Sequence, residues 1–300
     1  MADPDDQFKI DKRRVRHSFD RAAATYDGAA VLQREICDRM LERLDYIKLQ
    51  PERILDAGAG TGYGSRKLAA RYAEARLTLL DLAPGMLQAA RHQQSGWRRL
   101  LPFLSSRETH VCADIEHLPL GDDSVDLIWS SLALQWCNDP ETVFRGMHRV
   151  LRANGLLMFS TFGPDTLKEL RQSFGALDSH THVNRFIDMH DLGDALIRAG
   201  FASPVMEMET LTLTYDGVLD LMRDLKAIGA HNATQGRAQG LAGKEAFRRM
   251  EQNYERLRRD GKLPATYEVI YGHAWKGEGV GTSASWTEDG QQVAPIRFKP

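Results

Sequence analysis

The fold is decided by Ile54-Leu55-Asp56-Ala57-Gly58-Ala59-Gly60-Thr61-Gly62-Tyr63-Gly64. The apolar residues at its start suit a central parallel strand, and they run directly into a glycine-rich turn. Glycine adopts positive φ and lets the backbone come close to a ligand. A helix that begins there points free N–H groups and its positive dipole end at the same ligand. The stretch therefore predicts a strand, a ligand-binding turn and a helix.

The spacing of the glycines argues against a dinucleotide. That fingerprint is G-x-G-x-x-G, whose last small residue packs the helix against the strand. Counted from Gly58, Gly60 fits, but the sixth position is Tyr63. What remains is an acid followed by glycines at alternate positions. A glycine-rich turn without a ligand stays open as an alternative, because short motifs give false positives.

An acid followed by alternate glycines resembles motif I of class I S-adenosylmethionine-dependent methyltransferases. In that family the glycine loop passes under the methionine part of the cofactor. The resemblance therefore implies that Asp56, Gly58, Gly60 and Gly62 bind S-adenosyl-L-methionine.

A second apolar run, Leu77 to Asp81, ends in an acid nineteen residues after Gly62. An acid about 20 residues past a glycine loop, at the tip of the second strand, accepts hydrogen bonds from ribose hydroxyls. The family resemblance also implies that Leu82 lies against adenine. A helix cap before Pro84 is the alternative for Asp81, because aspartate is a preferred cap and proline suits the first turn.

Two further segments follow in the order of the family. A short strand leads to Asp114, which resembles the family residue that accepts from the adenine amino group, with Ile115 on the ring face. Residues 124–131 resemble the strand after which the sulfonium end of the cofactor meets the substrate, and this implies a place for Ser130 in the cofactor site. Four motifs in this order are a strong signal, although each alone is weak.

The rest of the chain predicts an α/β fold. Strands are expected near 53–57, 76–81, 109–113, 125–130, 156–161, 205–213 and 267–275, with helices between them. This order predicts a Rossmann-like, doubly wound, seven-stranded sheet whose ligand lies at the carboxyl ends of the strands. Helices near 164–178, 188–199, 216–229 and 243–259 are expected to form a cap over the active-site face.

Four stretches describe the expected organisation. Residues 1–27 form an N-terminal lid, 28–162 the S-adenosylmethionine-binding core, 163–275 the helical cap with the last two strands of the same domain, and 276–300 a flexible tail. In related methyltransferases such a leader folds over the cofactor, and Phe19 and Tyr26 would then exclude water. A solvated leader whose aromatic residues only staple the next helix is the alternative.

Composition bounds the possible partners. The net charge is −2, so nothing global favours nucleic acid, and no apolar run is long enough to span a bilayer. Three cysteines fit no disulfide framework or metal spacing, and reduced core cysteines, Cys112 among them, suit a cytoplasmic enzyme. His180 and His182 have no Cys or acid partners at ligand spacing, so no metal is expected. The oligomeric state is left open.

Nearly the full length resembles one subfamily, the malonyl-[acyl-carrier protein] O-methyltransferases of biotin synthesis. The segments that carry the resemblance are 19–26, 32–35, 114–120, 130–137, 162–170, 225–230 and 264–275. The glycine loop has Ala59 where cysteine is common in the family, a small change. The resemblance implies that the substrate is malonyl carried on acyl carrier protein, and that its free carboxylate is converted to a methyl ester.

This chemistry requires few catalytic groups. A carboxylate is already ionised at neutral pH, so its attack on a sulfonium methyl group needs no general base. Catalysis would come from in-line positioning in a dry pocket. An arginine can hold a carboxylate and still leave an oxygen lone pair for attack. Arg185 is the first candidate, Lys226 and Arg16 are weaker ones, and Tyr26 would close the pocket.

The carrier is acidic, so a positive rim near the pocket is expected, with Arg98, Arg99 and Arg171 as candidates. Two other functions remain open at this stage. The cap motifs also resemble the mitochondrial complex I assembly factor that hydroxylates an arginine of a partner subunit. A C-methyltransferase acting on a quinone precursor would need a membrane-facing patch, and no amphipathic membrane helix is evident.

Overall fold

The computed structural model describes residues 8–93, 107–175, 182–230, 232–236 and 244–277. Its helices are α1 (Lys12–Ala22), α2 (Tyr26–Ala29), α3 (Val31–Arg43), α4 (Tyr63–Arg71), α5 (Pro84–Gln93), α6 (Pro140–Val150), α7 (Lys168–Gly175), α8 (Met189–Arg198), α9 (Val218–Ala227) and α10 (Lys244–Glu255). Its strands are β1 (Arg53–Ala57), β2 (Arg76–Asp81), β3 (Glu108–Cys112), β4 (Val125–Ser131), β5 (Leu151–Phe162), β6 (Ala202–Tyr215) and β7 (Leu263–Trp275). Short 3₁₀ turns are η2 (Leu44–Tyr46), η4 (Ile115–His117) and η5 (Leu134–Trp136).

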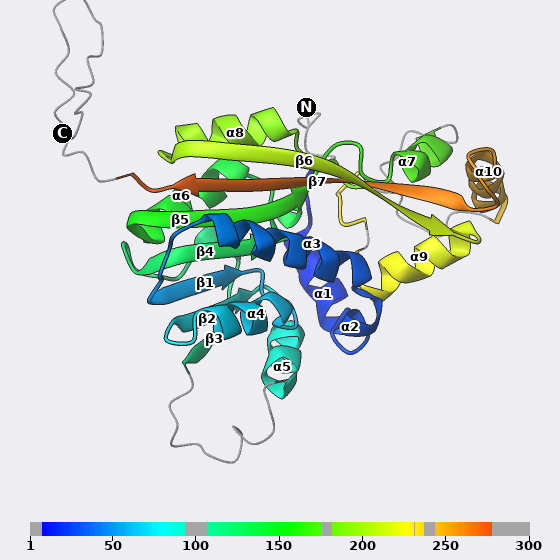
Figure 1. Ribbon diagram of the computed structural model, residues 1–300. Helices are drawn as coiled ribbons and strands as arrows, with labels where there is room; N and C mark the ends of the chain where they lie inside the picture. The colour runs from blue at the N-terminus through cyan, green and yellow to red at the C-terminus, as the bar shows by residue number, and fades with distance from the viewer. Residues whose placement is uncertain (1–7, 94–106, 176–181, 231, 237–243, 278–300) are drawn as a thin grey trace, which may run out of the picture.

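The strands form one sheet in the order β3-β2-β1-β4-β5-β7-β6 (Figure 1). β1 to β5 are parallel, and β7 runs antiparallel between β5 and β6. The predicted seven-stranded, doubly wound α/β sheet is confirmed. The strand order reverses beside β1, and open α/β sheets bind ligands in the crevice at such a switch point.

The side chains of the parallel strands lie in two hydrophobic cores, one on each face of the sheet, because successive side chains along a strand point to opposite faces. Ile54 and Trp129 lie in the core that α3, α4 and α5 cover. Leu55 and Ile128 lie in the core under α6 and α8. All four side chains are essentially inaccessible to solvent.

β6 and β7 are longer than predicted, and this length positions the cap. Their pairing runs from Ala202 opposite Trp275 to Tyr215 opposite Leu263. Figure 1 shows the two strands extending past the parallel strands toward α7, α9 and α10.

Two sequence expectations were wrong. The helix near 188–199, α8, does not belong to the cap, because its buried face (Leu192, Ala195, Leu196) packs into the core beside α6. Cys112 is exposed rather than in the core, because it ends β3 at the edge of the sheet. The tail beyond residue 277 lies outside the described residues.

The pairing of β5 with β7 generates a stability prediction. Phe159 lies opposite Gly272, and a Cβ added at Gly272 would lie 2.3 Å from Cζ of Phe159 and 3.0 Å from the sulfur of Met206. Gly272→Ala should therefore lower the free energy of unfolding by about 1–3 kcal/mol, the usual cost of overpacking. Urea denaturation measures this difference. Gly121→Ala is the control, because a Cβ added there would meet no atom within 4 Å. Equal losses for both variants would contradict the packing argument.

Candidate active site

A pocket with an empty volume of about 1300 Å³ opens at the carboxyl ends of β1, β2 and β4. This main pocket is enclosed by the glycine turn, the N-terminal segment, the 182–186 segment and the cap. A second, smaller pocket of about 500 Å³ adjoins it beneath the glycine turn. The residues that line both pockets are Tyr26, Gln33, Gly58, Gly60, Ser131 and Leu132.

The glycine turn has the backbone conformation that its sequence predicts. The φ angles of Gly58, Gly60 and Gly62 are 90°, 54° and 79°. Residues with a side chain rarely adopt positive φ, because the Cβ atom makes it unfavourable. A Cβ on Gly58 would lie 2.3 Å from Cβ of Ala133, so packing also excludes a side chain there. A Cβ added at Gly60 would meet no atom within 4 Å, and Gly60 lines both pockets. Gly62 is the N-cap of α4.

Asp81 ties the turn to the end of β2. One carboxylate oxygen accepts the N–H of Gly60 and the other accepts the N–H of Ala83, both at 2.8 Å. Asp81 and Leu82 line the main pocket. Burial raises the pKa of Asp81 to about 6.

Asp56 lies below the turn and lines the smaller pocket. Its carboxylate accepts the hydroxyl of Ser65 at 2.5 Å, and the side chain is 1% exposed. Burial raises the pKa of Asp56 to about 7, because the charged carboxylate loses its hydration there.

Asp114 and Ile115 form another wall of the main pocket. The Asp114 side chain accepts the N–H of Glu116 at 3.0 Å and so caps η4. Lys12 donates to the same carboxylate at 3.0 Å and lies 3.1 Å from Glu116. Among the described residues that line this pocket, Lys12 is the one lysine or arginine.

Ser130 does not face either pocket. It is fully buried, and its hydroxyl donates to the carbonyl of Ala57 at 2.8 Å, which joins β4 to β1. Its neighbour Ser131 lines both pockets. The alternation of side chains along β4 separates the two serines, and applying that period to residues 124–131 would have identified Ser131.

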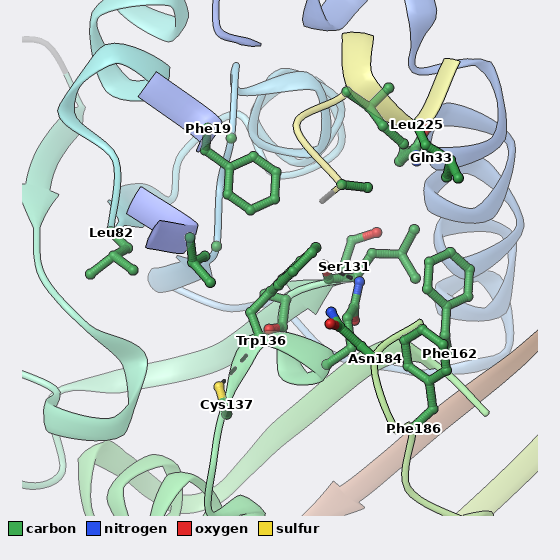
Figure 2. A pocket seen from close by; sticks show the side chains of 18 of the residues that line it. Phe19, Gln33, Leu82, Ser131, Trp136, Cys137, Phe162, Asn184, Phe186 and Leu225 are labelled. Carbon is green, nitrogen blue, oxygen red and sulfur yellow. Dashed lines mark hydrogen bonds between the residues drawn. The ribbon is translucent and has the colours of Figure 1, made fainter. Parts of the chain in front are cut away.

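The N-terminal segment lies along the main pocket. Phe19 and Tyr26 both line it, and Phe19 packs edge-on against Trp136 with ring centroids 5.2 Å apart (Figure 2). The start of this segment is anchored at Ile10, whose N–H donates to the side-chain oxygen of Asn138 at 2.7 Å. Burial raises the pKa of Tyr26 far above its usual range, so its hydroxyl stays neutral.

The far end of the main pocket is largely apolar. Phe162 and Phe186 meet edge-on with centroids 5.9 Å apart, and Leu170, Leu225 and Tyr267 add to the wall (Figure 2). Sequence reasoning did not identify Asn184, which also lines the pocket, is 6% exposed and accepts the N–H of Ala233.

Arg185, the first candidate for the substrate carboxylate, is exposed and is not among the lining residues, although both chain neighbours are. Its guanidinium carbon lies 5.4 Å from the centroid of Phe8. Lys226 and Arg16 are also exposed and outside the lining. Arg171 donates to the carbonyls of Pro164 and Thr166.

Arg98, Arg99 and His180 lie outside the described residues. The ring of His182 stacks on Phe174 with centroids 4.0 Å apart. Within the part of the chain that the structure describes, no group of three metal-ligating side chains occurs. No described helix is both long and apolar enough to cross a membrane.

The donor set fits S-adenosyl-L-methionine. The open backbone at Gly60 admits a ligand, Asp81 keeps lone pairs for ribose hydroxyls, and Leu82 and Ile115 offer apolar surface for a purine. The side-chain oxygen of Gln33 is buried without a partner at the junction of the two pockets. With the doubly wound sheet, this site defines a class I S-adenosylmethionine-dependent methyltransferase.

Comparisons with known proteins agree with this class. Residues 55–159 match the family model described as a methyltransferase domain. The chain is 64% identical to the malonyl-[acyl-carrier protein] O-methyltransferase of Laribacter hongkongensis, over 90% of this chain and 91% of that protein. It is 61% identical to the protein of that name from Gallionella capsiferriformans, over 98% and 99%. The chain therefore belongs to the malonyl-[acyl-carrier protein] O-methyltransferase family.

Solved structures share the fold at low sequence identity. The YcgJ protein of Bacillus subtilis superposes with a TM-score of 0.55 at 14% identity, over 80% of this chain and 98% of that one. A putative methyltransferase of Bacillus halodurans gives 0.56 at 16% identity, over the same shares.

The buried carboxyl of Asp56 generates a pH prediction. Its pKa is about 7 in the folded chain, against about 3.9 for an unperturbed aspartate. Between these pH values the folded state therefore keeps a proton that the unfolded state has lost. Stability should therefore fall as pH rises from about 4 to about 7, by up to about 4 kcal/mol from this group. Asp56→Asn removes the titration and should flatten that part of the curve.

Denaturant unfolding at pH 5 and pH 8 measures the difference. Asp194→Asn, an exposed site on α8, is the control and should follow the wild-type curve. Parallel curves for wild type and Asp56→Asn would contradict the prediction.

Proposed function

We propose that the chain transfers the methyl group of S-adenosyl-L-methionine to the free carboxylate of malonyl-[acyl-carrier protein]. The product is the malonyl methyl ester that starts pimeloyl, and thus biotin, synthesis. The observation that carries this proposal is 64% identity across nine-tenths of both chains to a protein of that name. The relatives favour carboxyl methylation over the arginine hydroxylation that the cap motifs left open. A substrate borne on a carrier protein supports a location in the cytoplasm.

The pocket suits a reaction without a general base. When bound, the cofactor supplies a methyl group activated by a sulfonium, and a malonyl carboxylate arrives already ionised. Phe19 and Trp136 close over the site and exclude water, which otherwise hydrates and weakens the nucleophile. Phe162 and Phe186 offer an apolar wall to the acyl chain. The protein then contributes mainly alignment and desolvation.

Intact-mass measurement of malonyl-loaded carrier protein tests the function directly. After incubation with the enzyme and S-adenosyl-L-methionine, the carrier should gain one methyl group in place of one hydrogen. Acetyl-loaded carrier lacks the carboxylate and should gain nothing. If the malonyl carrier is unchanged while the enzyme binds cofactor, the proposal is wrong.

Two basic features are proposed to receive the substrate. Arg185 is exposed between two pocket-lining residues, Asn184 and Phe186, and is assigned to the malonyl carboxylate. Helix α1 closes the pocket with its buried side and exposes Arg13 and Arg14 on the outside, where an acidic carrier would dock. Neither Arg13 nor Arg14 has a carboxylate within ion-pair distance among the described residues.

Kinetics with two thioesters separate these roles. Arg185→Ala should raise KM about tenfold or more both for malonyl carrier protein and for a malonyl thioester without carrier, because a charged hydrogen bond to the carboxylate is lost. Replacing Arg13 and Arg14 together by alanine should raise KM for the carrier substrate alone. Cofactor affinity should stay unchanged in both variants. Loss of cofactor affinity in Arg185→Ala would overturn its assignment.

A further inference from the structure

Gln33 presents an unpaired hydrogen-bond acceptor to the site. Its side-chain oxygen is buried and has no partner. Leaving a buried polar group unpaired costs about 1–3 kcal/mol, so a ligand that pairs it gains affinity. Figure 2 labels Gln33 among the side chains that surround the main pocket, and it lines the smaller pocket as well.

The smaller pocket has a second unpaired group. The indole N–H of Trp129 is buried without a partner and lines the same space. The described residues contain four such buried atoms, on Gln33, Asp38, His110 and Trp129. Two of the four therefore meet at one small pocket, one as an acceptor and one as a donor. A ligand end that carries both a donor and an acceptor would satisfy them.

Charge in the smaller pocket fits the same kind of ligand. Arg34 follows Gln33 on α3 and lines this pocket, and it donates to the carbonyl of Asp27. No carboxylate lies within ion-pair distance of its guanidinium among the described residues, so the positive charge stays available. Asp27 and Asp56 also line this pocket, and their carboxyl groups favour a cation there. The smaller pocket is therefore lined by one cationic side chain, that of Arg34, and by several hydrogen-bond acceptors.

We propose that Gln33 and Arg34 recognise the amino-acid end of S-adenosyl-L-methionine. The side-chain oxygen of Gln33 accepts from the α-ammonium group, and the guanidinium of Arg34 pairs with the α-carboxylate. The two residues are consecutive at the start of α3, and the buried side chains of Leu32 and Ile36 fix the position of that helix. One helix turn therefore binds both the α-ammonium and the α-carboxylate group of the ligand. This inference rests on the S-adenosylmethionine-dependent class and is independent of the methyl acceptor.

The acceptor oxygen of Gln33 is what distinguishes this role from substrate binding. A malonyl carboxylate has no hydrogen to donate, so it cannot pair with that oxygen. An ammonium group has three. Gln33→Glu keeps an acceptor oxygen at the same distance from the backbone and should retain cofactor binding. If Gln33 instead bound a carboxylate, the new glutamate would repel that ligand and binding would be lost.

Calorimetric titration with three ligands tests the proposal without any acceptor present. S-adenosyl-L-methionine carries both charges, its decarboxylated form keeps the amine alone, and methylthioadenosine lacks both. Gln33→Leu should weaken the first two by about tenfold or more and leave methylthioadenosine unchanged, because a hydrogen bond to a charged group is lost. Arg34→Leu should weaken S-adenosyl-L-methionine alone.

Gln50→Leu removes an amide at an exposed position and is the matched control. Thermal melting of each variant shows whether it is folded. Equal weakening of all three ligands in Gln33→Leu, or loss of S-adenosyl-L-methionine binding in Gln33→Glu, would overturn the proposal. Because no methyl acceptor is used, failure of the carrier assay would leave these binding differences intact.

Discussion

The site depends on the hydrogen bonds that hold the glycine turn against β2. Gly58 and Ala59 donate to the carbonyl of Leu80 at 2.8 and 3.0 Å, and Gly60 donates to the carboxylate of Asp81. These hydrogen bonds pair the backbone N–H groups of the turn, which would otherwise be buried without a partner. They also aim the turn at the two pockets. The cofactor site is therefore part of the sheet itself, and its geometry follows from how β1 and β2 pair.

The acceptor side is assembled from segments that are distant in sequence. The N-terminal segment contacts two distant parts of the chain through hydrogen bonds. Asp11 N–H donates to the carbonyl of Ala233 at 2.9 Å, and Ile10 N–H donates to the side-chain oxygen of Asn138 at 2.7 Å. The long β6–β7 ribbon carries α7, α9 and α10 beside them (Figure 1). Closing the pocket thus couples the first helix to the cap. A chain that opens at one of these contacts exposes the pocket to water.

Particular residues show where sequence reasoning succeeded and failed. The glycine turn, Asp81 and Asp114 were recognisable because local spacing along strands and turns decides where they lie. Ser130 was assigned to the site, but its hydroxyl joins two strands, because the pleat turns Ser131 toward the pocket instead. Arg185 is exposed while its neighbours line the pocket, and no local pattern in an irregular segment shows which side chain turns inward.

The sequence by itself determined the doubly wound sheet, the glycine turn and the acids at the strand ends, since each follows from local periodicity and backbone conformation. The resemblance along nearly its full length also determined the family, because the order of motifs can be read from the sequence without knowing how the chain packs. Only the tertiary structure decided which side chains share the pocket. It placed Gln33 of α3 beside a turn some 25 residues later, and it moved α8 from the cap to the sheet. Such placements depend on contacts between distant segments, and local sequence does not encode these one by one.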